Sequence, residues 1–353
     1  MDLKNRKNRN EANAGSSVVS NGRTIVPGLT ILLFFEDFER DSFVRGDRFA
    51  KRVVKPLWNM ITTKQKVFGF QMWFRRLGSS LVNEGFDVRI NDYATAAAFP
   101  KYPVGIAGYP WALNHWALDN PILLGPGMFD HPLQKPNLFD DPRFRLYLVT
   151  CEWNRNLFGG YYGFGRVRDW FGGIDTKDWP STTNEPKQYD FLIYDKVRWD
   201  RGNVARGLLE KIEDTLTRQH LTWTTLKYKG HDHKAYRKAL KESRALLFLC
   251  EHETQGMAYQ EAMASGLPVL AWDPGFWQDP LQRRLGIHEP IASSSVPYFD
   301  DSCGVTFYSP SDFDRSLQRF LEGKFHPREF VERCLNPTRS ASLYASSYFS
   351  LLE

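Results

Sequence analysis

The chain has 353 residues, of which 42% are hydrophobic and 25% charged, and its formal net charge is +5. These values are ordinary for a soluble globular protein, and the length suits two domains, each with its own core. Its four cysteines are scattered without a C-x-x-C pair, which excludes a disulfide framework or zinc knuckle and suits a reducing cytoplasm. No run of about 18 apolar residues predicts a membrane span.

Residues 1–24 are polar, rich in Asn and Ser, and without hydrophobic periodicity, which predicts a disordered basic tail. The stretch has no apolar core and is therefore no signal peptide. A basic tail without an apolar anchor would bind acidic lipid only weakly, so a solvated tail is favoured. We expect a cytoplasmic protein, with weak peripheral contact at the inner membrane face as the alternative.

Apolar runs alternate with helical periodicity through residues 25–180. Residues 29–36 are expected as a buried strand and residues 66–84 as a helix, followed by a turn and a second strand in Glu84–Ile90. Further short strands are expected at Pro103–Ala107, Pro121–Gly125 and Phe144–Cys151. This alternation predicts a parallel sheet with helices on both faces, so residues 25–180 are assigned to an N-terminal Rossmann-like domain.

The stretch 176–188 is rich in Thr, Pro, Asn and Lys, and we place an interdomain linker at 181–188. A second alternation fills residues 189–335. Its expected strands are Phe191–Tyr194, Leu221–Tyr228, Ala245–Cys250, Val269–Trp272 and Gly304–Tyr308, and its expected helices are 203–218, 233–243 and one from Ser311. A last helix is expected within 336–353. Two such alternations predict an α/β fold of two Rossmann-like domains facing a cleft.

The most informative segment begins Glu253-Thr-Gln-Gly-Met-Ala-Tyr-Gln-Glu261 and continues Ala-Met-Ala-Ser-Gly-Leu-Pro-Val. Gly256 opens a helical stretch, and a helix N-terminus beside a glycine is an anion site. The two carboxylates are better placed to accept hydrogen bonds from hydroxyl groups on either side of the anion. A nucleotide-sugar has this order of sugar, diphosphate and ribose. The alternative is an amphipathic helix with two solvated glutamates. The spacing of the glutamates alone would allow it, but the full string, with Gly256 and the Ala-Met-Ala-Ser-Gly-Leu-Pro-Val segment in register, makes it the weaker interpretation.

This string resembles the signature of the retaining glycosyltransferases of GT-B fold, specifically glycosyltransferase family 4 (glycosyl transferases group 1). Glu253, Gly256, Met257 and Glu261 match the first glutamate, the glycine, the aliphatic residue and the second glutamate. The chain departs from the family at Gln255, where an aromatic residue is usual, and at Cys250, where serine is frequent. The resemblance implies a hexosyltransferase-like enzyme, and a last helix that crosses back to the N-terminal domain.

After the first strand of the second domain the chain reads Asp195-Lys196-Val-Arg198-Trp-Asp-Arg201-Gly202. Lys196 and Arg201 match the spacing of the family's two basic positions, where each would neutralise the donor diphosphate. Arg198 could substitute for either. A solvated basic loop is the alternative, which would be favoured if the loop stood alone.

The resemblance also implies roles for the remaining candidates. The helix start at Gly256, Met257 and Ala258 would hold the diphosphate. Glu253 would orient hydroxyls of the donor sugar, and Glu261 would accept from the ribose.

The loop at Gly230 would contact the base. A first-domain histidine near the donor sugar is assigned to His131, with His115 as the competing candidate and a plain loop histidine as the alternative.

No metal or other cofactor is expected. Asp312 and Asp314 form a D-x-D, but Ser311 is a good N-cap and acids in a first helical turn suit the helix dipole, so the motif is interpreted as structural. His231 and His233 are interpreted as solvated loop histidines because nothing nearby completes a metal site.

The sequence therefore predicts transfer of a sugar from a nucleotide-sugar to a carbohydrate, lipid-linked or small-molecule acceptor, with retention of configuration. One alternative is a GT-B sugar-nucleotide epimerase, which shares the donor site. Another is a catalytically idle sugar- or nucleic-acid-binding protein, supported only by the basic tail, so no nucleic acid partner is expected. The base, sugar, acceptor and linkage are not predicted.

Overall fold

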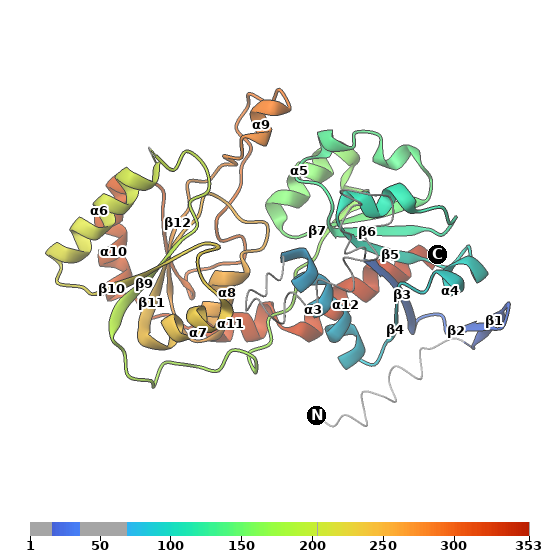
Figure 1. Cartoon of the computed structure of the whole chain (residues 1–353), viewed down its shortest axis with the longest axis horizontal. Coiled ribbons are helices and arrows are strands. Elements are labelled where there is room, and N and C mark those ends of the chain that lie inside the picture. Colours follow the sequence, from blue (N-terminus) through green and yellow to red (C-terminus); the bar gives the residue numbers. More distant parts are fainter. Residues whose placement is uncertain (1–15, 36–68, 203, 353) are drawn as a thin grey trace, which may run out of the picture. The chain divides into compact units, whose positions relative to one another are not determined.

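A computed structural model describes residues 16–35, 69–202 and 204–352. The chain forms two compact units, shown as ribbons in Figure 1. Unit 1 takes in the described residues up to Val149, then Tyr161–Trp170, and the chain from Ser340 onward. Unit 2 consists of Thr150–Gly160 and Phe171–Arg339.

Unit 1 contains a six-stranded parallel sheet in the order β4-β3-β5-β6-β7-β8. Its strands are β3 (Thr30–Phe35), β4 (Asp87–Ile90), β5 (Val104–Gly108), β6 (Ile122–Gly127), β7 (Phe144–Val149) and β8 (Val167–Asp169). Every residue of β3 is buried, as a central parallel strand requires. Five of these strands overlap segments that their apolar runs predicted, whereas the three-residue β8 was not predicted.

The helices of unit 1 include α3 (Gly69–Asn83) and α4 (Tyr93–Ala98). The helix expected at 66–84 is thus confirmed from residue 69, and residues 66–68 lie outside the described part. The last helix, α12 (Pro337–Phe349), belongs to unit 1 from Ser340. Its Tyr348 hydroxyl accepts from Leu32 N at 3.0 Å and donates to Pro103 O, so the C-terminal segment is hydrogen-bonded into the sheet of unit 1.

A two-stranded hairpin precedes this sheet. Strands β1 (Val18–Ser20) and β2 (Arg23–Ile25) pair antiparallel on either side of Asn21 and Gly22, whose φ angles are 47° and 71°. Asn-Gly suits a two-residue turn that needs positive φ at both positions. The predicted disordered tail is therefore wrong for residues 18–24, and residues 1–15 lie outside the described part.

Unit 2 contains a five-stranded parallel sheet in the order β10-β9-β11-β12-β13. Its strands are β9 (Tyr189–Asp195), β10 (Trp223–Lys227), β11 (Ser243–Leu249), β12 (Val269–Trp272) and β13 (Gly304–Phe307). Alternate side chains face opposite sides. Leu192 and Tyr194 of β9 enter one core, and Phe191 and Ile193 enter the other.

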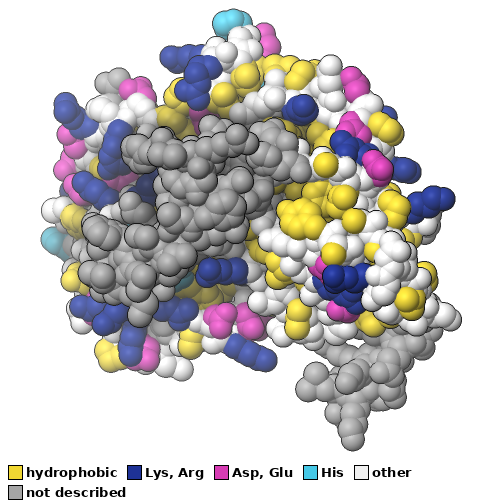
Figure 2. Space-filling model, turned by 45° about the vertical axis from the view of Figure 1, so that its right-hand side comes forward, with side chains coloured by type: hydrophobic (Ala, Val, Ile, Leu, Met, Phe, Trp, Pro, Cys, Tyr) yellow, Lys and Arg dark blue, Asp and Glu magenta, His cyan; other side chains and the backbone are white. Residues whose placement is uncertain are grey.

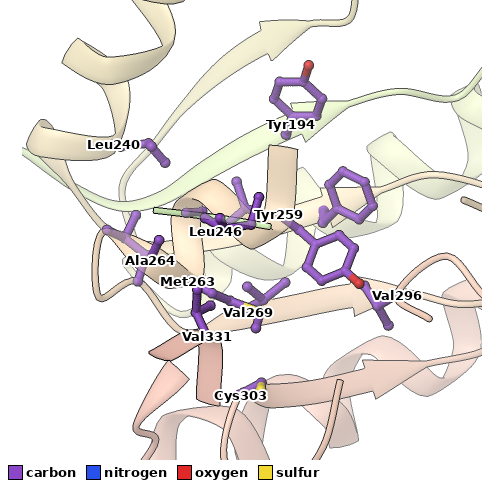
Figure 3. Close-up of a cluster of buried hydrophobic side chains, with 14 of the residues drawn as sticks. Tyr194, Leu240, Leu246, Tyr259, Met263, Ala264, Val269, Val296, Cys303 and Val331 are labelled. Carbon is purple, nitrogen blue, oxygen red and sulfur yellow. The ribbon is translucent and has the colours of Figure 1, made fainter. Parts of the chain in front are cut away.

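Helices cover both faces of this sheet (Figure 1). One face carries α7 (His233–Glu242), α8 (Met257–Ala264) and α11 (Pro327–Cys334), and the other carries α6 (Val204–Arg218) and α10 (Phe313–Glu322). Figure 3 shows the first core, where Leu240, Met263 and Val331 of the three helices lie among strand residues. Two further helices are α5 (Glu152–Tyr162) and α9 (Leu281–Arg284).

The first strand of each sheet lies between the second and the third, so β3 stands between β4 and β5, and β9 between β10 and β11. The connections leave in opposite directions from this point, and open parallel sheets bind ligands there, at the carboxyl ends of the strands. In unit 2 these ends are Asp195 of β9 and Leu249 of β11. The loops that follow β9 and β11 are therefore where this fold would bind a ligand in unit 2.

The chain passes between the units at Val149–Thr150, Gly160–Tyr161, Trp170–Phe171 and Arg339–Ser340. The segment 181–188, expected as a linker, lies within unit 2. There Thr182 N donates to Ser265 O at 2.9 Å and Gln188 N donates to Glu242 O at 2.8 Å. In the described part of the chain, no helix combines the length and apolar character needed to cross a lipid bilayer.

Candidate functional site

The N-terminus of α8 begins at Gly256, as the sequence predicts. Gly256 is the N-cap residue, with φ 80° and ψ 51° in the left-handed region. A Cβ at this position would lie 2.1 Å from Cε1 of the buried Tyr259, so only glycine fits. The N–H groups of the first turn, at Met257 and Ala258, have no acceptor within their own helix, which is the property that makes such an end an anion site.

Lys196 and Glu253 lie together beside this helix end. The Lys196 Nζ forms an ion pair with Glu253 Oε1, and the two side chains are only 13% and 9% exposed. Burial alone would lower the pKa of Lys196, but the adjacent Glu253 carboxylate raises the pKa above its ordinary value. The structure thus joins two predicted site residues from the loops after β9 and β11.

Glu251 fixes these two loops to each other and was not predicted. Its carboxylate is fully buried, and Oε1 accepts from Arg198 N at 2.7 Å and from Trp199 N at 2.9 Å. Arg198 Nη2 donates to His252 O at 2.5 Å, and its Nε lies 3.6 Å from Glu251 Oε2. The only sequence signal was a second glutamate two positions before Glu253, directly after a buried strand.

Arg201 has a different partner from the one expected. Its Nη1 donates to Asp195 Oδ1 at 2.9 Å and to Val197 O at 2.9 Å, and Nη2 pairs with Asp195 Oδ2. Asp195 ends β9 and is 1% exposed. The guanidinium therefore neutralises a buried carboxylate, while a role of Arg201 at a diphosphate stays a prediction.

We expect Arg201→Ala to lower stability, in addition to any effect on turnover through the predicted role at the diphosphate. The substitution would leave the buried Asp195 carboxylate without its cation, and an unsatisfied buried acceptor costs about 1–3 kcal/mol. Denaturant unfolding should show this loss. Arg244→Ala, which removes an exposed pair with Asp190, is the matched control and should cost at most about 1 kcal/mol. A hundredfold loss of turnover with unchanged stability would contradict the structural role.

The three basic side chains of this loop are each matched by a carboxylate. Lys196 pairs with Glu253, Arg198 with Glu251, and Arg201 with Asp195. The cluster therefore carries no surplus positive charge. An incoming anion would have to re-pair one of these cations, and Lys196 is the one whose partner is itself expected to contact the ligand.

Aromatic side chains surround His252. The Trp199 ring stacks on the imidazole at 5.0 Å and 8°, and the rings of Trp153 and Trp277 meet it edge-on at 5.9 and 6.2 Å. Burial lowers the pKa of His252 well below its ordinary value, and the positive charges of Arg198 and Lys196 lower it further. The imidazole is therefore neutral at pH 7, and this aromatic wall was not predicted.

Cys250 takes the place where the resembling family frequently has serine. Its Sγ lies 3.5 Å from Glu253 Oε1 and 3.2 Å from His252 O. Burial raises the pKa of Cys250, and the Glu253 carboxylate raises it further, so the group remains a thiol. The thiol can donate to the same carboxylate that a serine hydroxyl would.

Glu261 lies on α8 and is 6% exposed. Burial raises the pKa of Tyr236, and the nearby Glu261 carboxylate raises it further. The Tyr236 hydroxyl donates to Ala258 O at 2.6 Å. His231, directly after Gly230, places Nε2 at 3.2 Å from the Tyr194 hydroxyl. The loop at Gly230 and the second glutamate therefore belong to one neighbourhood of unit 2.

His131 lies in unit 1, whereas the site residues discussed above belong to unit 2. It is the N-cap of the 3₁₀ turn Pro132–Gln134, where Nδ1 accepts from Leu133 N at 3.1 Å. Burial lowers its pKa, and the neutral ring then carries its proton on Nε2. The side chain of His115 lies outside the described part.

The D-x-D acids are bound to cations of the protein. Asp314 pairs with Lys211 and accepts from Thr215 Oγ1 at 2.8 Å, which ties α10 to α6. Asp312 pairs with Arg315 at 3.2 Å. The helix starts at Phe313 after a 3₁₀ turn, so Ser311 is not its N-cap as predicted. Among the described residues, no group of His, Cys, Asp and Glu is arranged to hold a metal ion.

No protein-family model and no curated protein match this chain. Several solved structures are similar to it. AviGT4, a glycosyltransferase involved in avilamycin A biosynthesis, is similar over 92% of this chain and 98% of its own, with 13% identity and a TM-score of 0.55. Sucrose-phosphate synthase from Thermosynechococcus elongatus is similar over 92% of this chain and 99% of its own, with 15% identity and a TM-score of 0.53.

The catalytic domain of starch synthase IV from Arabidopsis thaliana, bound to ADP and acarbose, is similar over 92% of this chain and 99% of its own. It shares 11% identity, and the TM-score is 0.51. Together with the two parallel sheets, these similarities show that the chain has the GT-B fold of two Rossmann-like domains, as predicted.

Proposed function

We propose that this protein is a glycosyltransferase, of hexosyltransferase type, which moves a sugar from a nucleotide-sugar to a carbohydrate or lipid-linked acceptor. The observation that carries the proposal is the helix end of α8 at Gly256. It lies at the carboxyl ends of the central strands, with the Lys196–Glu253 pair beside it and Glu261 on the helix itself. The fold's solved neighbours include sugar-transferring enzymes, which agrees with this assignment.

In the proposed complex the diphosphate lies on the N–H groups of the first turn of α8. Lys196 leaves Glu253 and pairs with the phosphate, which releases the Glu253 carboxylate to accept from hydroxyls of the sugar. Glu261 accepts from hydroxyls of the ribose. After this exchange Lys196 still faces an anion, and the buried Glu253 carboxylate is still hydrogen-bonded, now by hydroxyl groups of the sugar.

Negative charge grows on the diphosphate as the sugar leaves, so Lys196 and the helix end interact more strongly with the transition state than with the bound donor. We propose retention of configuration, in which the leaving phosphate itself assists the acceptor. In that reaction the side chains of the site position the donor and stabilise charge.

Glu261→Ala is expected to weaken nucleotide binding more than it harms folding. Loss of a charge-assisted hydrogen bond costs about 1.5–3 kcal/mol, which is about tenfold or more in affinity. Calorimetry on UDP, GDP, ADP and dTDP would measure this, with Glu213→Ala on the exposed face of α6 as the control. Unchanged affinity in a folded Glu261→Ala protein would sink the ribose assignment.

Turnover is expected to survive EDTA, and we propose that no metal or other cofactor takes part. The motivation is that Lys196, Arg198 and the end of α8 supply the charge stabilisation that a metal ion otherwise gives to a leaving diphosphate. Steady-state rates before and after chelation would test this. Loss of activity that manganese or magnesium restores would contradict it.

The function itself is tested by a thermal-shift panel of the four nucleoside diphosphates, followed by product analysis of the matching nucleotide-sugars. Ligand binding raises apparent stability by mass action. Conversion of the donor without acceptor to an epimer would establish the epimerase alternative instead.

A nucleic-acid-binding protein gathers its basic side chains in one patch or stripe. On the face shown in Figure 2, Lys and Arg side chains are interspersed with Asp and Glu side chains. The described side chains on this face therefore form no single basic patch of the kind that a nucleic-acid partner would need. Salt-sensitive binding of an oligonucleotide would establish such a partner instead.

A further inference from the structure

Gln255, the residue before the N-cap of α8, is fully buried and binds a segment far away in the sequence. Its Oε1 accepts from Gly172 N at 2.8 Å, and its Nε2 donates to Gly172 O at 2.7 Å. The side-chain amide thus satisfies both main-chain groups of one buried residue, as a neighbouring strand would.

Gln260 completes this arrangement from within α8. Gln255 Nε2 also donates to Gln260 Oε1 at 3.0 Å, and Gln260 Nε2 donates back to Gln255 O at 2.8 Å. Both N–H groups of the Gln255 amide are therefore used, and its oxygen is used as well. A glutamate could replace only the acceptor, and a methionine could replace neither.

Gly172 stands two residues after the chain passes from unit 1 into unit 2 at Trp170–Phe171. Its neighbour Gly173 packs so closely on Pro337 that an added Cβ would lie 2.5 Å from Pro337 Cα. Ile174 N donates to Leu335 O at 2.8 Å. The segment held by Gln255 therefore lies against the chain that returns to unit 1 at Ser340.

A second hydrogen bond holds the loop Glu253–Gly256. It comes from the part of unit 2 that precedes Tyr161–Trp170 in the sequence. Trp153, in the part of α5 that belongs to unit 2, donates its Nε1 proton to Glu253 O at 2.8 Å. The loop Glu253–Gly256 is thus attached to Trp153, three residues after Thr150, where the chain first enters unit 2, and to Gly172, two residues after Trp170, where it returns from β8.

We propose that Gln255 is a positioning residue. It couples occupation of the anion site on α8 to the main chain at Gly172, which lies beside the passage between the units at Trp170–Phe171. The proposal rests on the donor site proposed above. An anion that draws the N–H groups after Gly256 toward itself shifts the main chain of Gln255. The oxygen and both N–H groups of the buried amide are hydrogen-bonded, so the side chain moves with its main chain and transmits that shift to Gly172.

Hydrogen exchange on the full chain tests this coupling. The probe is whichever of UDP, GDP, ADP and dTDP binds the wild type by calorimetry, used at saturation for each variant. In the wild type, the nucleotide should slow exchange both at Gly256–Ala258 and, about tenfold, at Gly172. In Gln255→Met, slowing at Gly256–Ala258 should persist and slowing at Gly172 should be lost.

Two further variants make the result interpretable. Gln255→Glu keeps the acceptor for Gly172 N and loses both donors, so it serves if the methionine variant fails to fold. Its nucleotide-dependent slowing at Gly172 should be smaller than that of the wild type. Gln318→Met is the matched control, because Gln318 bonds only Glu322 along the exposed face of α10 in the described structure, and it should behave as the wild type.

The outcomes separate the two proposals. If no nucleotide binds the wild type, the donor site falls, and the coupling with it. If nucleotide binds and protects Gly256–Ala258 but leaves Gly172 unchanged, the donor site stands and the coupling is overturned. Equal slowing at Gly172 in the wild type and both Gln255 variants would also overturn it, since the amide would then transmit nothing.

Discussion

Lys196→Ala is expected to lower turnover by about 10²–10³-fold, the effect typical of removing one preorganised charge stabiliser. The Nζ group pairs with Glu253 in the free protein and, in the proposed complex, with the diphosphate. Its interaction grows as charge develops, so kcat should fall more than affinity for the intact donor. Lys196→Arg should be milder, because the positive charge remains.

The matched control is Lys238→Ala, which removes an exposed lysine that pairs with Glu242 along α7. Steady-state kinetics on folded, purified variants decide the matter. Circular dichroism is needed alongside, because Glu253 loses its cation in Lys196→Ala and remains buried. Near wild-type turnover in Lys196→Ala would leave Arg198, Arg201 and the helix end as the groups considered for the diphosphate.

Gly256→Ala should abolish nucleotide binding, with at least about a hundredfold loss of affinity. A left-handed conformation costs an L-residue about 1–2 kcal/mol. The new methyl group would also meet the Tyr259 ring at 2.1 Å. That ring cannot retreat easily, because it is fully buried and its hydroxyl bonds both Tyr298 N and Gln260 Nε2.

Gly207→Ala is the control for this substitution. Gly207 lies on α6 with nothing within 4 Å of an added Cβ, so alanine there should stabilise the protein by about 0.5–1 kcal/mol. Calorimetric titration with the nucleotide that binds the wild type provides the measurement. Retained affinity in Gly256→Ala would show that the geometry of this helix end does not matter for the ligand.

The sheets could be predicted because their central strands are buried on both faces. β9 and β11 enter two cores with alternate side chains, so they appear in the sequence as short, continuous apolar runs. β8 has only three residues, two of them exposed, and gives no such signal. α5 carries two consecutive glycines, which weaken a helical pattern.

The candidate site could be predicted only as far as local sequence determines it. Gly256 follows from the need for a left-handed residue before α8, and the string around the glutamates indicated it. The partners of Glu251 are the main-chain N–H groups of Arg198 and Trp199. Every residue except proline has such a group, so the sequence does not indicate which ones a carboxylate will bind. Gln255 and Gly172 lie 83 positions apart, and only the packed structure brings them together.

The route of the chain through β8 bears on how the two units could be exchanged in a chimera. A chimera that exchanges residues 171–339 as a block would leave the native Trp153 to meet a foreign glutamate loop, because Thr150–Gly160 belongs to the same unit as that loop. Extending the block to residue 150 would instead import a foreign edge strand into the sheet of unit 1. Neither unit is contiguous in the sequence, so the proposed donor specificity is better exchanged by point substitutions within the loops than by swapping whole domains.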